Sequence, residues 1–573
     1  MANCRFVDEL YRLRKSSRES IDNIEKFDDF KRYMHIVRKA EKDLKEILTS
    51  VNASGKKTLI LLCGSAGDGK SHLLSYLRNE ERMLNDYLVF NDATESSEPS
   101  KTAIDTLNEE LSDFSDDNLE KKGKNIILAI NLGVLSNFIE SPYAENYQML
   151  LKYVENNNIL TTAINHNSYI ENSYFQHVSF SDYHMYTLSN KGAEPKYIQA
   201  ILNRIFGRIE ENPFFSTYQA SCQICPLAQK CPVKHNYEFL MDEQVQEYIA
   251  HSLVEVIVKE KEILTTREIL NYIYDILVVH RFSYKTLSDV SIIDSAFLKE
   301  YLGDISPVLM FDYEDISPVL NHLAKYDPLL ERSESADELA IFYYVSPDIS
   351  SEVKRVFDNT PYAVVLNQQE IIDKLNEDKT LKAQIFNILI RIESIKKGIK
   401  TDTIYSQYIT DLYYFNQGKI PKLAHLYDLV EKAVTQWCGS DSGNAICLDE
   451  SRAGFTLFEN IKFEPYLDDI PTKNHVTSLE QFVPSIVVKY EDQKTKNIIE
   501  LDIDYSLYEL LYKLKNGYIQ TANDRNNYAD FISFIEKILK TGSAAEEVFV
   551  ISETGKKASV KRTKFGYRFK VVK

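Results

Sequence analysis

The sequence lacks long hydrophobic runs and an excess of basic residues, and each absence excludes a class of protein. Its apolar stretches, such as residues 58–63, are far shorter than the roughly 20 residues that a membrane-spanning helix needs. Residues 1–20 are charged throughout and lack the apolar core of a signal peptide, so we expect a cytoplasmic protein. The net charge of −18 excludes a protein that coats nucleic acid through its bulk charge.

Catalytic signatures are also missing. The sequence has no Ser/His/Asp or Cys/His catalytic set, no H-E-x-x-H motif and no nuclease-like spacing of acidic residues, so we expect that it does not cut DNA itself. The seven cysteines are an odd number, and three of them lie in one short segment. This pattern favours a reducing compartment and a metal site over a disulfide framework.

The residues that are present predict an α/β fold. Hydrophobic residues make up 44% of the 573 and charged residues 27%, which is typical of a soluble globular protein with several domains. An amphipathic helix is expected over residues 27–48. Short apolar runs predict buried parallel strands at residues 58–63, 87–92, 126–131 and 177–180, with helical segments between them. Strands that alternate with helices in this way indicate a parallel sheet.

Changes in pattern along the chain predict its division into domains. A nucleotide-binding core is followed by mostly helical segments and then by a mixed region with short strands, one helix at residues 528–540 and a basic tail. The expected parts are N-terminal helices (1–54), a P-loop core (55–195), a helical segment with the cysteines (196–262), a helical lid (263–345), a helical region (346–451) and a C-terminal α+β domain (452–573).

The strongest motif is G-x-x-x-x-G-K-[ST], with an apolar strand before it and a helix after it. Glycines let the backbone wrap around a polyphosphate, and the helix presents its positive end to the same charge. A lysine then reaches the β- and γ-phosphates, and a hydroxyl group is a ligand for Mg²⁺. The motif predicts a site for ATP and Mg²⁺, made by Gly64, Ser65, Ala66, Gly67, Asp68, Gly69, Lys70, Ser71 (the Mg²⁺ ligand) and the following His72.

Whether the nucleotide is hydrolysed depends on an acidic residue that is harder to place. The strand at 126–131 ends in Asn131 instead of Asp, and the nearest acidic residues, Asp92 and Glu95, follow the second strand. Two interpretations follow. Either Asp92 is the Mg²⁺ partner, or Asn131 senses the γ-phosphate, as in the AAA+ ATPases that this arrangement resembles. Arg267, at the start of a lid-like helix over 264–277, matches the sensor arginine of that superfamily. A slow ATPase and a binding-only switch both fit, and both place Asn131 near the nucleotide.

A second cluster has the residue types of a metal site. Cys222 and Cys225 form a C-x-x-C knuckle, and Cys231 and His235 follow within ten residues. These four side chains suit structural Zn²⁺, which would leave no open position for a substrate. An iron–sulfur cluster and free thiols in a helical insertion are the alternatives.

The C-terminus holds the only basic concentration, residues 556–573. Phe565, Tyr567 and Phe569 alternate with Arg568 and Lys570, so a strand would place aromatic and basic side chains on opposite faces. We expect the last strand of a small sheet, with its aromatic side chains inward. The alternative is an element that binds nucleic acid through its Lys and Arg side chains.

Four segments together resemble one family. GSAGDGKSHLLSYL, FNDATES, ILAINLGVLSNF and the C-x-x-C with its third cysteine are similar to the DptF family of DNA phosphorothioation-dependent restriction proteins, over residues 55–235. The resemblance implies an ATP-binding component of an antiviral defence system. Such components act with DptG and DptH partners against DNA that lacks sulfur in its backbone. A stand-alone P-loop signalling switch of the AAA+ or STAND type is the alternative function.

Overall fold

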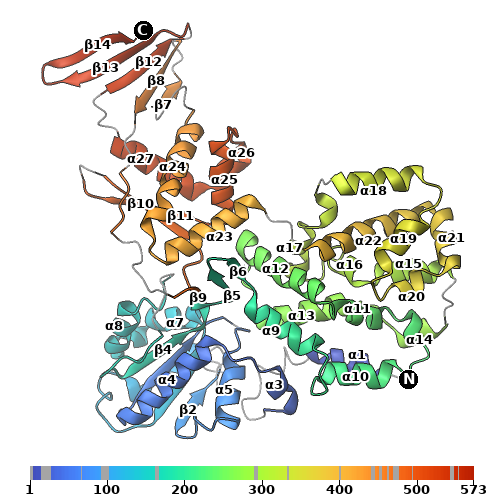
Figure 1. Cartoon of the computed structure of the whole chain (residues 1–573). Coiled ribbons are helices and arrows are strands. Elements are labelled where there is room, and N and C mark those ends of the chain that lie inside the picture. The colour runs from blue at the N-terminus through green and yellow to red at the C-terminus, as the bar shows by residue number, and fades with distance from the viewer. Residues whose placement is uncertain are drawn as a thin grey trace. The chain divides into compact units, whose positions relative to one another are not determined.

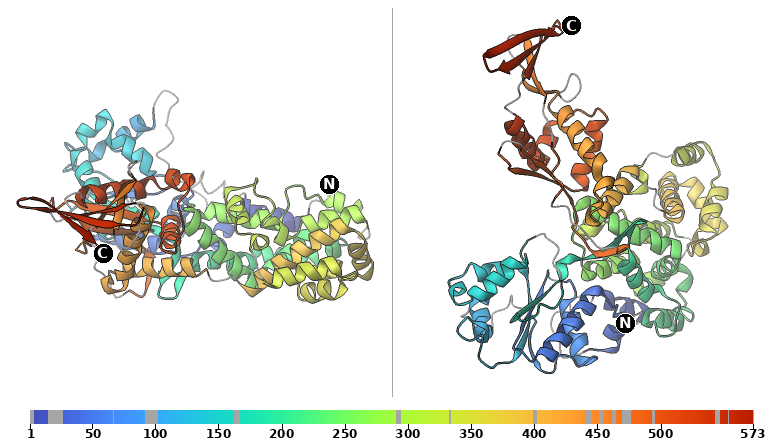
Figure 2. Two further views of the ribbon diagram at one scale, coloured as in Figure 1. Left: turned by 90° about the horizontal axis from the view of Figure 1, so that it is seen from above. Right: turned by 60° about the vertical axis from the view of Figure 1, so that its left-hand side comes forward.

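The chain forms two compact units. Unit 1 comprises Met1–Thr187 and Glu194–Lys400, and unit 2 comprises Leu188–Ala193 and Thr401–Lys573. Figures 1 and 2 show the computed structural model from three directions. It describes residues 4–14, 27–65, 67–91, 102–161, 167–289, 294–331, 334–398, 402–439, 445–450, 454–460, 464–468, 476–492, 495–542, 547–552 and 554–572.

A four-stranded parallel sheet forms the centre of the first part of unit 1. Its strands are β1 (Leu59–Cys63), β2 (Tyr87–Phe90), β3 (Asn125–Ile130) and β4 (Phe175–Ser179). They lie in the order β2-β3-β1-β4, and every neighbouring pair is parallel. The predicted α/β class with a parallel sheet is therefore confirmed, and the four predicted strands are these four.

Helices cover both faces of this sheet, which explains why β1, β2 and β3 are apolar at nearly every position. Side chains alternate along β1, so Leu61 packs in one hydrophobic cluster and Leu62 in the other. The first cluster includes residues of α6 (Ala103–Glu110), α7 (Leu132–Ile139) and α8 (Gln148–Asn156). The second includes residues of α4 (Lys39–Ser54) and α5 (Lys70–Asn79).

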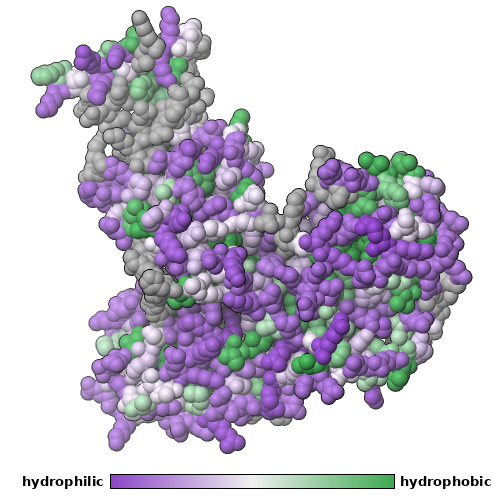
Figure 3. Space-filling view, viewed as in Figure 1, coloured by the Kyte–Doolittle hydropathy of each residue, from purple (hydrophilic) through white to green (hydrophobic). Residues whose placement is uncertain are grey.

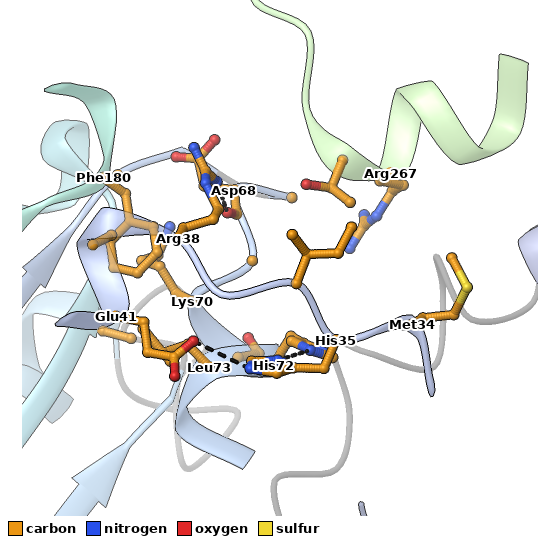
Figure 4. Close-up of a pocket in the computed structure, with 18 of the residues that line it drawn as sticks. Met34, His35, Arg38, Glu41, Asp68, Lys70, His72, Leu73, Phe180 and Arg267 are labelled. Atoms are coloured by element: carbon orange, nitrogen blue, oxygen red, sulfur yellow. Dashed lines mark hydrogen bonds and ion pairs between the residues drawn. The ribbon is translucent and has the colours of Figure 1, made fainter. Parts of the chain in front are cut away.

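The prediction of a single helix over residues 27–48 is wrong. The chain forms α3 (Asp29–Met34) and α4, with extended backbone at His35 and Arg38 between them. The Arg38 guanidinium holds this break in place, because it donates to the carbonyl oxygen of Tyr183 at 2.9 Å and lies over the ring of Tyr197. The interruption brings His35 and Arg38 beside the loop that follows β1 (Figure 4).

The rest of unit 1 is mostly helical, as predicted for residues 196–345. No helix among the described residues is long and apolar enough to cross a membrane. Two short strands, β5 (Tyr183–Ser189) and β6 (Gly192–Glu194), each have residues in both units. The remaining α-helices of unit 1 are α1 (Arg5–Leu10), α9 (Lys196–Phe206), α10 (Pro213–Cys222), α11 (Pro232–Leu240), α12 (Glu243–Glu260), α13 (Thr266–Leu277), α14 (Tyr284–Asp289), α15 (Ser295–Gly303), α16 (Ser306–Leu309), α17 (Pro318–Ala324), α18 (Glu334–Val345), α19 (Ser350–Phe357), α20 (Ala363–Leu366), α21 (Gln369–Glu377) and α22 (Lys379–Lys397).

Unit 2 combines helices with antiparallel strands. Its sheet of five strands has the order β14-β13-β12-β8-β7, and β10 pairs with β11. One helix was predicted after residue 452, whereas the structure has three. The elements are α23 (Thr403–Asn416), α24 (Ile420–Trp437), β7 (Ala445–Glu450), β8 (Phe455–Asn460), β9 (Ser478–Gln481), β10 (Ile486–Glu491), β11 (Ile498–Ile503), α25 (Tyr505–Lys515), α26 (Ala522–Asn527), α27 (Ala529–Gly542), β12 (Glu547–Ser552), β13 (Lys557–Thr563) and β14 (Gly566–Val572).

The last strand also differs from its prediction. β14 does close a sheet, and its aromatic and basic side chains do alternate between the two faces. The aromatic side chains, however, are not inward: Tyr567 and Phe569 are 77% and 68% exposed. The described residues pack no second layer over them.

Candidate functional site

The loop between β1 and α5, from Gly64 to Ser71, has a shape that depends on glycine. Gly67 and Gly69 have φ angles of 91° and 95°, in the left-handed region where other residues are strained. A Cβ atom on Gly67 would also lie 3.1 Å from the Thr265 hydroxyl oxygen, so the loop packs tightly against the start of α13. Ala66 lies outside the described residues.

Two charged side chains fold back onto the loop itself. One carboxylate oxygen of Asp68 accepts a hydrogen bond from the Ser65 backbone N–H at 2.5 Å, and the Lys70 ammonium donates to the Ser65 carbonyl oxygen at 2.6 Å. Burial raises the pKa of the Asp68 carboxyl group, while Lys70, the Ser65 N–H and Arg38 oppose that rise. The Ser65 N–H, a group that could bind an anionic ligand, is therefore occupied by the loop's own carboxylate.

The predicted phosphate-binding residues surround one cavity of about 280 Å³ (Figure 4). The structure brings together residues from the loop, the strand ends, the α3–α4 break, α9 and the start of α13. The predicted residues that line the cavity are Gly64, Gly67, Asp68, Gly69, Lys70, Ser71, His72, Asn131 and Arg267. Ser65 belongs to the same loop. Asp92 and Glu95 lie outside the described residues, so their predicted roles stay predictions.

Asn131 lies where the sequence predicts it, at the carboxyl end of β3. Its side-chain oxygen accepts a hydrogen bond from the Gly133 backbone N–H at 2.9 Å and caps the start of α7. Because the carboxyl ends of parallel strands meet at one edge of a sheet, Asn91 after β2 lines the cavity beside it. This edge of the sheet is polar, although no carboxylate among the described residues follows β2 or β3 directly.

Arg267 enters the cavity from the first turn of α13. The helix start is fixed by a capping box, in which the Thr265 hydroxyl accepts from the Glu268 N–H and the Glu268 carboxylate accepts from the Thr265 N–H. The Nε atom of Arg267 is buried and makes no hydrogen bond with any residue that the structure describes. A buried guanidinium N–H without an acceptor is costly, so this group is suited to an anionic ligand.

Sequence reasoning missed the contribution of the α3–α4 break. His35 Nδ1 and His72 Nε2 share a hydrogen bond at 3.1 Å, and His35 Nε2 lies 3.2 Å from a carboxylate oxygen of Glu41. Burial, together with the charges of His35 and Lys31, lowers the pKa of His72 to about 4, which keeps its ring neutral. Arg38 adds a second guanidinium to the cavity. No local pattern identifies these residues, because they lie about 30 positions before the loop.

The four predicted zinc ligands do not form a metal-binding group as they stand. Cys222 ends α10 and Cys231 precedes α11, but the His235 ring is buried and shares a hydrogen bond with the Tyr301 hydroxyl at 2.7 Å. Within the described ranges, no group of three or more His, Cys, Asp or Glu side chains could hold a metal ion as it stands. Burial raises the pKa of the Cys222 and Cys231 thiols to about 12, and the Cys4 thiol contributes to both. Zinc stays a prediction, which metal analysis of the purified chain tests.

Comparison with known proteins finds no matching family model, no matching curated protein and no matching solved structure. Function must therefore be inferred from the chain's own α/β fold and cavity. The cavity combines loop N–H groups, a lysine, a serine hydroxyl and two guanidinium groups. That combination suits a polyphosphate with a bound cation better than it suits an apolar or cationic ligand.

Proposed function

We propose that the loop from Gly64 to Ser71 is a P-loop that binds ATP with Mg²⁺. The observation that carries the proposal is the convergence of Lys70, Ser71 and Arg267 on one cavity, from two helices far apart in sequence. A glycine-rich turn without function would not need an arginine with a buried Nε atom from a second helix. The parallel sheet supports the proposal too, because ligands of such sheets bind at the carboxyl ends of the strands.

Each residue has a defined task in this proposal. The backbone N–H groups of the loop cradle the phosphates, and the Lys70 ammonium exchanges the Ser65 carbonyl for phosphate oxygens. The Ser71 hydroxyl is the protein ligand for Mg²⁺, which neutralises charge on the phosphates when it is bound. The apolar side chains of Met34, Ile201 and Leu270 line the same cavity and offer a surface for the base.

Arg267 and Asn131 would make the site sensitive to the terminal phosphate. Arg267 belongs to α13 and Asn131 to the edge of the sheet, so a γ-phosphate between them links two parts of unit 1. Loss of that phosphate would remove one partner of Arg267 and release α13 from the loop. The proposal is therefore a nucleotide-dependent switch. Its turnover as an ATPase would need a carboxylate such as Asp92 or Glu95.

Thermal unfolding with and without Mg·ATP tests the proposal. At about a thousandfold excess over the dissociation constant, a ligand stabilises the fold by ~4 kcal/mol. We expect Mg·ATP to raise the unfolding temperature of the wild type and of Lys152→Ala, a matched change of an exposed lysine on α8. Lys70→Ala should show little or no rise. Equal shifts in all three proteins would contradict the proposed role of Lys70.

We further propose that the chain acts in restriction of DNA that lacks phosphorothioate, together with DptG- and DptH-like proteins that carry the nuclease. The resemblance across residues 55–235 supports this role. In a host with the complete gene cluster, Lys70→Ala should abolish restriction of unmodified plasmid and leave sulfur modification of host DNA intact. If restriction persists, a signalling switch outside the restriction reaction becomes the better explanation. If modification is lost, the chain acts on the other side of the system.

A further inference from the structure

The C-terminal edge of unit 2 exposes both faces of one strand. β14 is the last strand of the five-stranded sheet and pairs with β13, with Val560 opposite Phe569 and Lys561 opposite Arg568. Residues opposite each other in an antiparallel pair share a face, and alternate residues point to opposite faces. The register therefore separates an aromatic face from a basic face.

The aromatic face carries side chains that folding alone does not explain. Tyr567 is 77% exposed and Phe569 is 68% exposed, and Phe565 at the tip of the hairpin is fully exposed. Val571 continues the same face of β14 and is also exposed. Figure 3 shows hydrophobic and hydrophilic residues side by side on the visible part of this sheet. Contiguous apolar side chains in water mark a binding surface.

The opposite face is basic. Lys561, Arg568 and Lys570 lie on it and are exposed, with Lys557 in the same register. Residues 556–573 contain eight Lys and Arg residues and no Asp or Glu, in a chain whose net charge is −18. Lysine on an edge strand also protects against pairing with other strands. That explanation covers the lysines but leaves the exposed aromatic side chains unexplained.

The spacing of the aromatic side chains along β14 favours a nucleic-acid strand whose bases are not stacked on one another. Successive side chains on one face of a β-strand lie about 6.6 Å apart, at roughly 3.3 Å per residue. That is about twice the ~3.4 Å rise per nucleotide of a stacked DNA strand. Two rings at this spacing can stack on two successive bases if the nucleic-acid strand is extended and its bases are unstacked from each other. A duplex keeps its base faces covered.

We propose that the β13–β14 hairpin binds single-stranded nucleic acid. Bases stack on Tyr567 and Phe569. Because β14 is an edge strand, Lys and Arg side chains on its opposite face extend past the edge and contact the phosphates. This combination of aromatic platforms and positive charge binds single strands with little sequence preference. The site is separate from the nucleotide cavity of unit 1, and the proposal does not depend on ATP binding.

Fluorescence anisotropy with a labelled oligo-dT and the full chain tests the proposal. We expect Tyr567→Ser/Phe569→Ser to bind roughly 10- to 100-fold more weakly than the wild type, because each stacked base contributes substantially. Tyr567→Phe should retain binding, since it keeps the ring. Ile519→Ser removes a side chain that is 76% exposed elsewhere in unit 2 and should leave binding unchanged.

The basic face predicts a different signature. Arg568→Ser/Lys570→Ser should reduce the slope of log affinity against log salt by about 1.4, because each phosphate contact to a single strand contributes about 0.7. Lys537→Ser, on the exposed side of α27, serves as the control. Absence of oligo-dT binding by the wild type would overturn the proposal. So would equal binding by Tyr567→Ser/Phe569→Ser, or a loss of self-association in that variant without any loss of oligo-dT binding.

Discussion

The Asp68 carboxylate lies in the part of its own loop where the proposed phosphate would bind. Its carboxylate accepts from the Ser65 N–H and lies 2.7 Å from where a Cβ atom of Gly64 would be, close to the Lys70 ammonium. A phosphate that binds there must displace the carboxylate or overcome its charge. In the proposed nucleotide site, the aspartate would therefore weaken binding at the position where the loop would cradle a phosphate.

Removing this carboxylate should strengthen binding. We expect Asp68→Ala to bind Mg·ATP several-fold to about tenfold more tightly, the range that a lost repulsion of about 1 kcal/mol implies. Isothermal titration calorimetry measures the difference, and Asp117→Ala, an exposed aspartate away from the cavity, is the control. Weaker binding by Asp68→Ala would show that the carboxylate instead holds the loop in its binding shape.

His425 predicts a pH dependence within unit 2. Its Nε2 shares a hydrogen bond of 2.8 Å with Asp411, a buried carboxylate that also accepts from the Tyr508 hydroxyl. The hydrogen bond to Asp411 raises the pKa of His425 above its ordinary value. A raised histidine pKa stabilises the folded state at pH values below the ordinary histidine pKa of ~6.5. This contribution is lost as the pH rises through the pKa of His425 in the folded state.

The stability difference between the wild type and His425→Gln should therefore shrink as the pH rises. We expect the stability of the wild type to exceed that of the variant by more at about pH 5.5 than at about pH 8.5, because the charged ring gains more from Asp411 than the neutral ring does. Urea unfolding of both proteins at several pH values measures this. A difference that grows with pH would mean that the neutral ring is the form that Asp411 favours.

At the scale of elements, the parallel strands were predictable and the α3–α4 break was not. β1 and β3 are buried on both faces, so their sequences are nearly continuous apolar runs that stand out without any knowledge of their neighbours. β4 is also buried, although Gln176, His177 and Ser179 interrupt its apolar residues. The start of α13 was equally clear, because Thr265 and Glu268 form a capping box within the sequence itself. Arg267 could therefore be placed at a helix start before its surroundings were known.

The break at His35 to Arg38 depends on contacts that are distant in sequence. The segment between α3 and α4 has no glycine or proline, and its apolar spacing continues the helical pattern of its flanks. At the start of α4, the Arg38 side chain donates to the carbonyl oxygen of Tyr183, a residue 145 positions later. For the same reason the sequence did not reveal that His35 and Arg38 line the cavity. His235 was predicted as a zinc ligand from spacing alone, and spacing did not reveal that its Nδ1 shares a hydrogen bond with the Tyr301 hydroxyl.

The packing of α22 supplies a prediction at this scale. Arg391 of α22 is only 2% exposed and donates to both carboxylate oxygens of Asp327, at 3.1 and 2.5 Å, and to Asp312. Arg391→Ala would leave the buried Asp327 carboxylate without its counterion, so we expect a loss of about 3–5 kcal/mol in unfolding free energy. Lys432→Ala, in an exposed pair with Asp428, should cost less than about 1 kcal/mol. Urea unfolding measures both variants, and similar losses of unfolding free energy in the two would contradict this account.

At the scale of the whole molecule, the division into two compact units predicts two unfolding events. Each unit has its own buried core: the sheet clusters around β1 in unit 1, and residues such as Tyr408, Leu412 and Tyr508 in unit 2. Multidomain chains often depart from two-state unfolding, and a ligand stabilises the part that binds it. The proposed nucleotide site lies entirely in unit 1.

Differential scanning calorimetry should therefore resolve two transitions that respond to different changes. Mg·ATP should raise one transition and leave the other in place, because the cavity residues all belong to unit 1. Arg391→Ala should lower the transition that Mg·ATP raises, whereas His425→Gln at low pH should lower the other. Lys70→Ala should keep both transitions but lose the response to Mg·ATP. A single transition that all of these changes shift together would mean that the units unfold as one cooperative structure.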